Sequence, residues 1–179
     1  MTNDFFPIVN TWDLPENVIA TSYQEMANDG CLDREGIAMW GGTRDATGTA
    51  RVEAVVLLRG MGVERNRHFI RISSDLMNEV TDVLDSHNLS LIGQIHAHPP
   101  SSSTTLSPTD IRYGIAVPYY LSVVAPNYAS SSRPNLAECT AHVYEPSLGW
   151  RRFDHSEAKK RLRIGSQSQA RVITIGAER

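Results

Sequence analysis

The sequence predicts a single α+β domain in which helices cover a mixed β-sheet. The chain has 179 residues, which is the ordinary size of one domain. Hydrophobic residues make up 41% and charged residues 21% of the chain, so its composition is that of a globular protein that buries a core. Strand-like and helix-like segments come in mixed order, with hairpins and isolated helices, which is typical of this class.

The first predicted helix covers residues 13–29. Asp13 and Glu16 stand at the spacing of a capping box, and Gly30 follows the last helical residue as a stop signal. Apolar residues mark one side of this segment. We therefore expect that side of the helix to pack on the core.

The remaining elements follow from alternation, helical periodicity and turn signals. The turn-rich stretch TRDATGT between the first two strands predicts an antiparallel hairpin. A serine cap and a buried-face pattern predict a helix in the middle of the chain. In order, the sequence predicts strands at 35–42, 50–60 and 68–73, a helix that begins at Ser74 and ends near His87, a strand at 89–98, a short helix that begins near 108, and strands at 119–126, 139–145 and 149–154.

Charge, hydropathy and cysteine content exclude several classes of protein. The net charge of -3 removes the usual electrostatic basis for nucleic-acid binding, which depends on clustered Lys and Arg. The sequence has neither a run of about 18 apolar residues nor the basic and apolar parts of a signal peptide. Cys31 and Cys139 have no disulfide or metal spacing, so we expect reduced, inert core thiols. A cytoplasmic protein without membrane contact is the expectation.

The most informative segment is IHAHPPSSSTTLSPTD at 95–110. His96 and His98 are separated by one residue in a predicted strand, so both imidazoles should project from the same face. Together with Asp110 they supply three N/O ligands and leave a fourth position open to water, as catalytic zinc sites require. A metal-bound water attacks a carbonyl near neutral pH when a nearby carboxylate accepts its proton.

Each of these residues also has a structural interpretation. A strand histidine is usually a satisfied structural residue, and Ser107, Pro108 and Asp110 match a helix capping box. The two interpretations of Asp110 are compatible, because a cap fixes the direction of its carboxylate. His142 and His155 have no partner at ligand spacing, so we expect structural roles for both. Taken together, the same-face histidines and the cap-placed carboxylate favour a metal site.

The same segment resembles the signature of JAMM (JAB1/MPN/Mov34) metalloproteases. That signature is His-x-His-Pro, a short loop and Ser-x-x-Asp, preceded by a glutamate in an upstream strand. The matching residues are Glu35, His96, His98, Pro99, Ser107 and Asp110. The match spans about 35–125, half of the chain. Two features differ from the family: Ala97 replaces the common Ser or Thr, and the loop 99–106 is one residue longer than usual. We expect a bulge to absorb that residue without displacing the aspartate.

The resemblance implies a fold and a division of the chain. It implies an MPN-like curved mixed β-sheet flanked by helices, and the chain has the size of compact prokaryotic-type members. We expect the catalytic domain, including the N-terminal helix, to cover 1–155. The stretch 156–179 holds six Lys or Arg against two Glu, and we expect it to form a basic C-terminal tail or extension.

The resemblance also implies the role of each matching residue. It implies that His96, His98 and Asp110 bind Zn²⁺. It implies that Glu35 deprotonates the attacking water and returns the proton to the departing amine. Ser107 is implied as a hydrogen-bond donor to the oxyanion. The reaction implied is hydrolysis of a peptide or isopeptide bond at the C-terminus of a ubiquitin-like or sulfur-carrier protein, and the partner we expect is such a protein or its conjugate.

Three alternatives differ in class from a zinc peptidase. A non-catalytic MPN-type scaffold would bind protein partners, although such members typically lack the ligands that this chain has. A two-His-one-carboxylate set also suits Fe(II) oxygenases, but the usual order there begins His-x-Asp/Glu and ends with a distant His. A cupin-like site begins His-x-His but needs a Glu a few residues later, which HAHPPSSSTT lacks.

Overall fold

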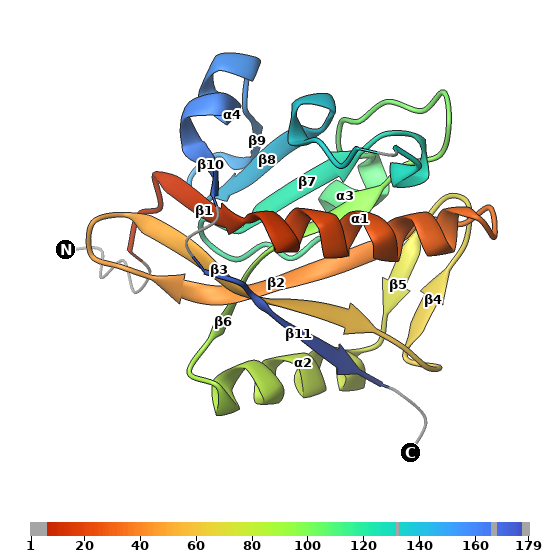
Figure 1. Cartoon of the computed structure of the whole chain (residues 1–179), viewed down its shortest axis with the longest axis horizontal. Coiled ribbons are helices and arrows are strands. Elements are labelled where there is room, and N and C mark those ends of the chain that lie inside the picture. The colour runs from red at the N-terminus through yellow and green to blue at the C-terminus, as the bar shows by residue number, and fades with distance from the viewer. Residues whose placement is uncertain (1–6, 132, 166–167, 177–179) are drawn as a thin grey trace.

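One mixed sheet organises the chain in the computed structural model, which describes residues 7–131, 133–165 and 168–176 (Figure 1). In chain order, the elements are β1 (Thr11–Pro15), α1 (Glu16–Gly30), β2 (Ile37–Arg44), β3 (Thr49–Leu58), β4 (Val63–Arg65), β5 (Ile70–Ile72), α2 (Ser74–Ser86), β6 (Ser90–Ala97), α3 (Pro108–Tyr113), β7 (Leu121–Ala125), the 3₁₀ turns η1 (Asn127–Ala129) and η2 (Leu136–Glu138), β8 (Thr140–Glu145), β9 (Gly149–Arg152), α4 (His155–Arg161), β10 (Leu162–Gly165) and β11 (Arg171–Ile175).

The strands lie in the order β10-β1-β3-β2-β6-β7-β8-β9, and β11 pairs with β3 beside this path. β2 runs antiparallel to both β3 and β6, whereas β6 and β7 are parallel. The sheet curls strongly, and β4 and β5 form a separate hairpin next to it (Figure 1). The α+β class, the curved mixed sheet with flanking helices and the single domain are confirmed.

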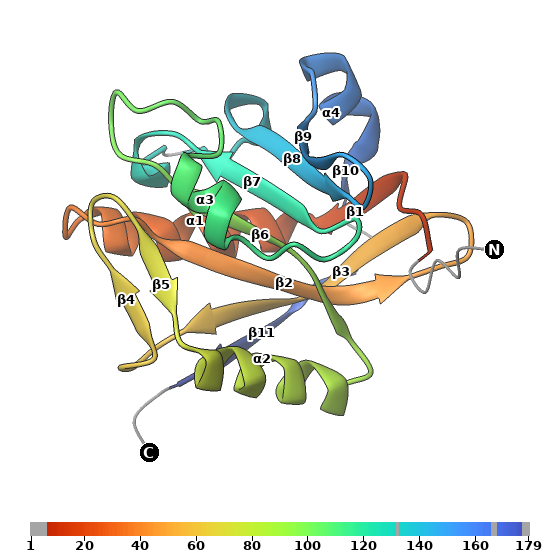
Figure 2. The same cartoon turned by 180° about the vertical axis from the view of Figure 1, so that it is seen from behind.

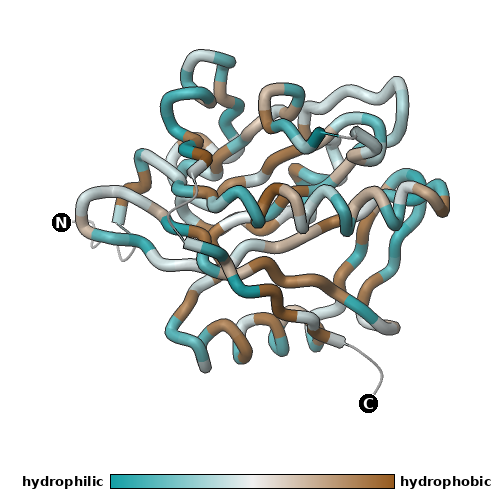
Figure 3. The backbone as a smooth tube through the Cα atoms, in the orientation of Figure 1, coloured by the Kyte–Doolittle hydropathy of each residue, from teal (hydrophilic) through white to brown (hydrophobic). Residues whose placement is uncertain are grey.

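Helices cover the two faces of the sheet differently. On one face, α1 packs over a large apolar cluster that includes Trp40, Ile95 and Val123. On the other face, α2 and the β4–β5 hairpin cover a second cluster, and α3 lies on the same side (Figure 2). Figure 3 shows that hydrophobic stretches concentrate in the central strands. Burial of each large apolar side chain in these clusters stabilises the fold by about 1.5–3 kcal/mol.

The first helix begins later than the sequence indicates. Asp13, expected at a capping box, lies inside β1, and Pro15 precedes the first helical residue without a side-chain cap. β1 forms because it pairs in parallel with both β3 and β10. Pairing with residues far away in the sequence therefore overrides the local capping signal. The strand β4 was not predicted from the sequence. The cap of α2 was expected at Ser74, but the N-cap is Ser73 and Ser74 is the first helical residue.

The boundary expected at residue 155 does not coincide with a break in the fold. β10 pairs with β1, and β11 pairs with β3 at the point where β1 has turned into α1. Between these strands, Asn17 of α1 bonds both backbone groups of Ala170 through its side chain, at 2.8 and 3.0 Å. Two strands of the expected extension, β10 and β11, are thus part of the main sheet, while residues 166–167 and 177–179 lie outside the described residues.

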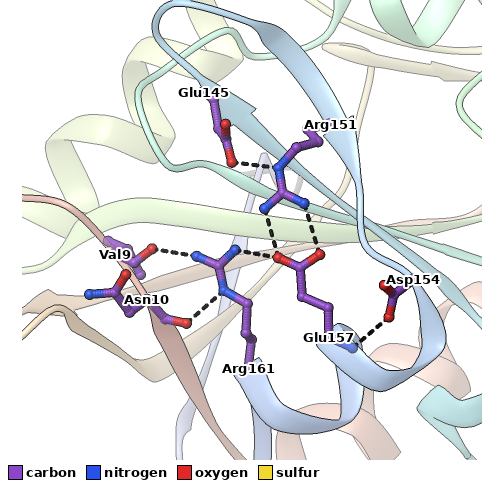
Figure 4. Close-up of polar contacts among 7 residues, drawn as sticks. All are labelled: Val9, Asn10, Glu145, Arg151, Asp154, Glu157 and Arg161. Carbon is purple, nitrogen blue, oxygen red and sulfur yellow. Dashed lines mark hydrogen bonds and ion pairs between the residues drawn. The ribbon is translucent and has the colours of Figure 1, made fainter.

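A network of partly exposed ion pairs holds α4 against the sheet (Figure 4). Glu157 accepts hydrogen bonds from Arg151 at 2.7 and 2.8 Å and from Arg161 at 2.8 Å. Arg161 also donates to the backbone carbonyls of Val9 and Asn10, at 2.9 and 2.7 Å. Arg161, in the basic stretch of α4, therefore links this helix to the segment before β1.

The cysteines are free, but one prediction about them is wrong. Cys139 is half-buried, and its thiol lies 3.1 Å from the hydroxyl of Tyr23. Cys31 is exposed at the C-cap of α1, so it is not a core residue. Within the described part of the chain, no helix is long and apolar enough to cross a membrane.

The Glu157 network predicts a pH-dependent contribution to stability. Hydrogen bonds from Arg151 lower the pKa of Glu157 from its ordinary 4.5 to about 2. Such a carboxylate stabilises the folded protein above about pH 4.5, and the contribution is lost as the pH falls toward 2. Glu157→Gln should lower the free energy of unfolding by about 1–2 kcal/mol at pH 7, since solvent partly screens the network, and by progressively less below pH 4.5.

Urea unfolding of the parent and the variant at pH 7, 4 and 2.5 measures this difference. Glu79→Gln, which removes an exposed carboxylate from α2, is the control and should change stability by less than about 0.5 kcal/mol at pH 7. A difference for Glu157→Gln that stays constant across this pH range would contradict the assignment.

Candidate metal centre

The register between β2 and β6 brings the upstream glutamate beside the two histidines. β6 ends with His96 and Ala97, and His96 pairs with Ile37 at the start of β2. Because the two strands are antiparallel, continuing the same register places Glu35 opposite His98. Residues far apart in sequence thus meet at one end of these strands.

A capping box at the start of α3 positions Asp110. The backbone N–H of Ser107 donates to Oδ2 of Asp110 at 2.7 Å, and the backbone N–H of Asp110 donates to the Ser107 hydroxyl at 3.1 Å. Pro108 occupies the first helical position. The cap predicted from the sequence is therefore confirmed. The long loop does not displace Asp110, and within that loop Ser101 adopts a φ of 66°.

Three side chains form a group that could hold a metal ion: His96, His98 and Asp110. The Nε2 atoms of the two histidines lie 3.2 Å apart. Oδ1 of Asp110 lies 3.6 Å from Nε2 of His96, and Oδ2 lies 3.3 Å from Nε2 of His98. A tetrahedral ion about 2.0–2.1 Å from each ligand separates its ligands by about 3.3–3.4 Å. The two imidazole nitrogens and the carboxylate therefore lie close enough together to share one ion of this kind.

The surrounding backbone selects the tautomer of His98 that can bind a cation. Its Nδ1 lies 2.6 Å from the carbonyl oxygen of Ser103, which is an acceptor only, so Nδ1 carries the proton. When this ring is neutral and a metal ion is bound, Nε2 presents its lone pair to the ion. A partner of this kind on the outer nitrogen orients a ligating histidine and makes it more basic.

Electrostatics keep Asp110 ionised. Burial alone would raise its pKa, but hydrogen bonds from His96 and His98 outweigh burial and hold the pKa well below its usual range. Burial opposes protonation of His98, yet the bonds to Asp110 and Ser103 and the charge of Glu35 raise its pKa overall. Asp110 is therefore an anion at neutral pH, as a carboxylate ligand must be.

Glu35 is a buried carboxylate in the same cavity. It is 5% exposed, and together with His96 and Asp110 it lines a cavity of about 160 Å³. Burial raises the pKa of Glu35 from 4.5 to about 7, against the opposing charge of His98. Its backbone N–H donates to the carbonyl of Asn66 at 2.8 Å, which fixes the segment before β2. A carboxyl group with this pKa is suited to exchange protons near neutral pH.

Ser107 lies one hydrogen bond away from the metal-ligand group. Its hydroxyl oxygen accepts from the N–H of Asp110, so the hydroxyl proton stays available to a further acceptor. The structure thus brings together Glu35, the two histidines, Ser107 and Asp110, all of which the sequence singled out. Of the two other histidines considered above, His142 is buried in β8 and His155 begins α4.

The sequence did not indicate the residues that fix the backbone of His98 at the end of β6. Tyr128 donates its backbone N–H to the carbonyl of His98 at 2.8 Å and its hydroxyl to Asp33 at 3.0 Å. It lies in η1, where residues 127–129 all have positive φ, between 52° and 55°. Non-glycine residues rarely adopt this conformation. No local signal in the sequence indicates three such residues in succession.

Comparison with solved structures shows the fold. The chain is similar to the solution structure of protein DSY2949 from Desulfitobacterium hafniense, with 17% identity, coverage of 89% of this chain and 96% of that one, and a TM-score of 0.61. It is also similar to the solution structure of a protein from Salinibacter ruber, with 16% identity, coverage of 89% and 95%, and a TM-score of 0.57. No family model matches the sequence, and neither does any curated protein.

The geometry predicts one bound divalent metal ion per chain. Protein dialysed after exposure to Zn²⁺ should retain about one equivalent by elemental analysis. His98→Ala should lose it because a ligand is removed, and Asp110→Asn should retain much less because the anionic ligand becomes neutral while the capping oxygen is kept. His155→Ala, at an exposed histidine of α4, is the control and should retain the metal. Equal retention in all four proteins would show that the ion binds elsewhere.

Proposed function

We propose that this protein is a zinc-dependent peptidase or isopeptidase of the JAMM type, which cleaves at the C-terminus of a ubiquitin-like or sulfur-carrier-like protein. One observation carries the proposal. Two imidazole nitrogens and the Asp110 carboxylate converge within reach of one metal ion, and a buried carboxylate with a raised pKa, Glu35, lines the same cavity. This combination of three protein ligands and one separate carboxylate is what metal-assisted hydrolysis requires.

The order of the ligands along the chain favours zinc over an iron oxygenase centre. Iron oxygenases usually order their ligands as His-x-Asp/Glu followed by a distant His, whereas here His96 and His98 precede Asp110.

Each residue of the site has one task in the proposed reaction. Zinc held by the two histidines and Asp110 would act as a Lewis acid and would lower the pKa of a bound water toward neutrality. Glu35 accepts the proton of the attacking water and then delivers it to the departing amine nitrogen, which its pKa of about 7 permits in both directions. Ser107 donates its free hydroxyl proton to the oxyanion that forms on the substrate carbonyl.

The surroundings of the cavity suit a narrow, extended peptide. The cavity of about 160 Å³ is smaller than the usual 300–1,000 Å³ of small-molecule sites, which favours a segment with small side chains. Ile70 and Ile72 of β5 line it. Within the described part of the chain, β5 pairs only with β4, so its outer edge is free to bond the backbone of an added strand. The C-terminal tail of a ubiquitin-like protein has these properties.

Glu35→Gln tests the proposed reaction. The variant keeps the size of the side chain but cannot accept a proton, so turnover of a ubiquitin-like domain fused through its C-terminus to a reporter should fall by a factor of about 10²–10⁴. Its zinc content should equal that of the parent, because Glu35 is not a ligand. Cleavage is measured by gel or mass spectrometry under single-turnover conditions, with zinc quantified in the same samples.

The pair of measurements separates the possible failures. Glu35→Gln that is zinc-loaded and as active as the parent contradicts the role of the base. A zinc-loaded parent that cleaves none of a panel of ubiquitin-like and sulfur-carrier fusions contradicts the substrate class. His98→Ala serves as the metal-free control and should be inactive.

A further inference from the structure

A second layer of polar side chains lies behind His96, on the face of the sheet that carries the metal centre. Gln94 and His96 share this face of β6 because they are two residues apart. Gln94 pairs with Ser122 of β7, and Ser122 pairs with His142 of β8. Paired residues of neighbouring strands project to the same side, so Ser122 and His142 share the face of His96. Ser122 and His96 also line the same cavity.

Three polar atoms in this layer have no hydrogen-bond partner among the residues that the structure describes. They are Nδ1 of His96, Oγ of Ser122 and Nδ1 of His142. The three residues are only 3%, 1% and 4% exposed. A buried polar group without a partner lowers stability, so three of them in one layer point to hydrogen bonds that join them directly or through water.

Metal binding requires one particular tautomer of His96. Its Nε2 is the nitrogen that faces His98 and Asp110, and a ligating nitrogen must present its lone pair. The proton of the neutral ring then resides on Nδ1, which becomes a buried donor in need of an acceptor. For His98 the backbone of Ser103 supplies this acceptor. For His96 no backbone carbonyl among the described residues does so, and the side chains of the polar layer are the candidates.

Ser122 and His142 can each accept one hydrogen bond in a row that starts at His96. Burial lowers the pKa of His142 to about 4, so its ring is neutral at pH 7. Nδ1 of His142 is buried without a partner among the described residues, and with the ring proton on Nε2 it presents a lone pair. A serine hydroxyl accepts one hydrogen bond and donates another. Ser122 therefore fits between a donor, His96, and an acceptor, His142.

We propose that Ser122 and His142 form a hydrogen-bond chain that holds His96 in its metal-binding tautomer. Nδ1–H of His96 donates to Oγ of Ser122, and the Ser122 hydroxyl donates to Nδ1 of His142, directly or through one buried water. Both are positioning residues, because they act on a metal ligand and not on the substrate. This hydrogen-bond chain rests on the metal centre of the proposed function. It adds to that centre two residues that lie outside the ligand set.

The test measures zinc affinity, by competition with a chromophoric chelator, for the full-length protein and its variants. Ser122→Ala removes the middle member of the chain and should raise the Kd for zinc about 10- to 100-fold. Ser122→Thr keeps a hydroxyl at this position and should restore most of the affinity. The visible spectrum of the Co²⁺-loaded protein gives a second readout, which should change in Ser122→Ala and revert in Ser122→Thr.

The second member of the chain is tested by a pair of substitutions at His142. His142→Asn keeps a polar atom close to the position of Nδ1, whereas His142→Leu does not, so only the leucine variant should weaken zinc binding. The double variant Ser122→Ala/His142→Leu should bind zinc no more weakly than Ser122→Ala alone. This follows because loss of Ser122 already disconnects His142 from His96.

A serine on the opposite face provides the matched control. Ser22 of α1 is fully buried, and its hydroxyl accepts from the indole N–H of Trp40 at 3.1 Å. Ser22→Ala deletes the same atom from the same residue type, away from the metal centre. It should lower the melting temperature of the metal-free protein and leave the Kd for zinc unchanged.

The possible outcomes distinguish a failure of the hydrogen-bond chain from a failure of the metal centre. If Ser122→Ala binds zinc as tightly as the parent, the chain is overturned and the metal centre stands. If the effects of Ser122→Ala and His142→Leu on zinc affinity are additive, the two residues act separately and the chain is again overturned. A parent that holds no more zinc than His98→Ala overturns both the metal centre and the chain.

Discussion

The antiparallel register between β2 and β6 is the constraint on which the candidate site depends. Pairing of Ile37 with His96 sets Glu35 opposite His98 through backbone hydrogen bonds alone. A shift of β6 by one residue would turn both histidines toward α1 and the apolar cluster beneath it, where they would find no ligand partner. Asp110 completes the group only because the cap of α3 points its carboxylate at the same place. The β-ladder and the helix cap therefore position these side chains, which make few direct contacts with one another.

The two faces of the sheet divide stability and chemistry between them. The α1 face is apolar, whereas the opposite face is apolar beneath α2 and the β4–β5 hairpin and polar beneath α3. The unpartnered atoms of His96, Ser122 and His142 and the left-handed residues of η1, each of which costs about 1–2 kcal/mol, lie beside the candidate site. Local strain of this kind persists only where surrounding structure compensates for it, and it concentrates at functional sites. The large cluster under α1 provides that compensation.

Local signals in the sequence predicted the part of the site that local structure forms. His96 and His98 share a face because strands alternate, and Asp110 is directed by a cap that can be recognised in four consecutive residues. Pairing between distant strands could not be predicted in this way. It turned the expected helical start at Asp13 into a strand and placed β10 and β11 inside the sheet. Ser122 was not singled out and His142 was expected to be structural for the same reason, since only the register of β7 and β8 aligns them behind His96.

The pairing of the two ends of the chain constrains the order in which the protein can fold. Trp12 pairs with Leu162, and Arg161 bonds the backbone of Val9, so contacts made by the first strand await residues synthesised some 150 positions later. The central strands β2, β6 and β7, which position the candidate site, need no such partner. During synthesis, the centre of the sheet can therefore assemble while the outer edge of β1 is still an unpaired strand. Contacts of such long sequence separation form slowly, and this edge is the place where a newly made chain is most exposed to aggregation.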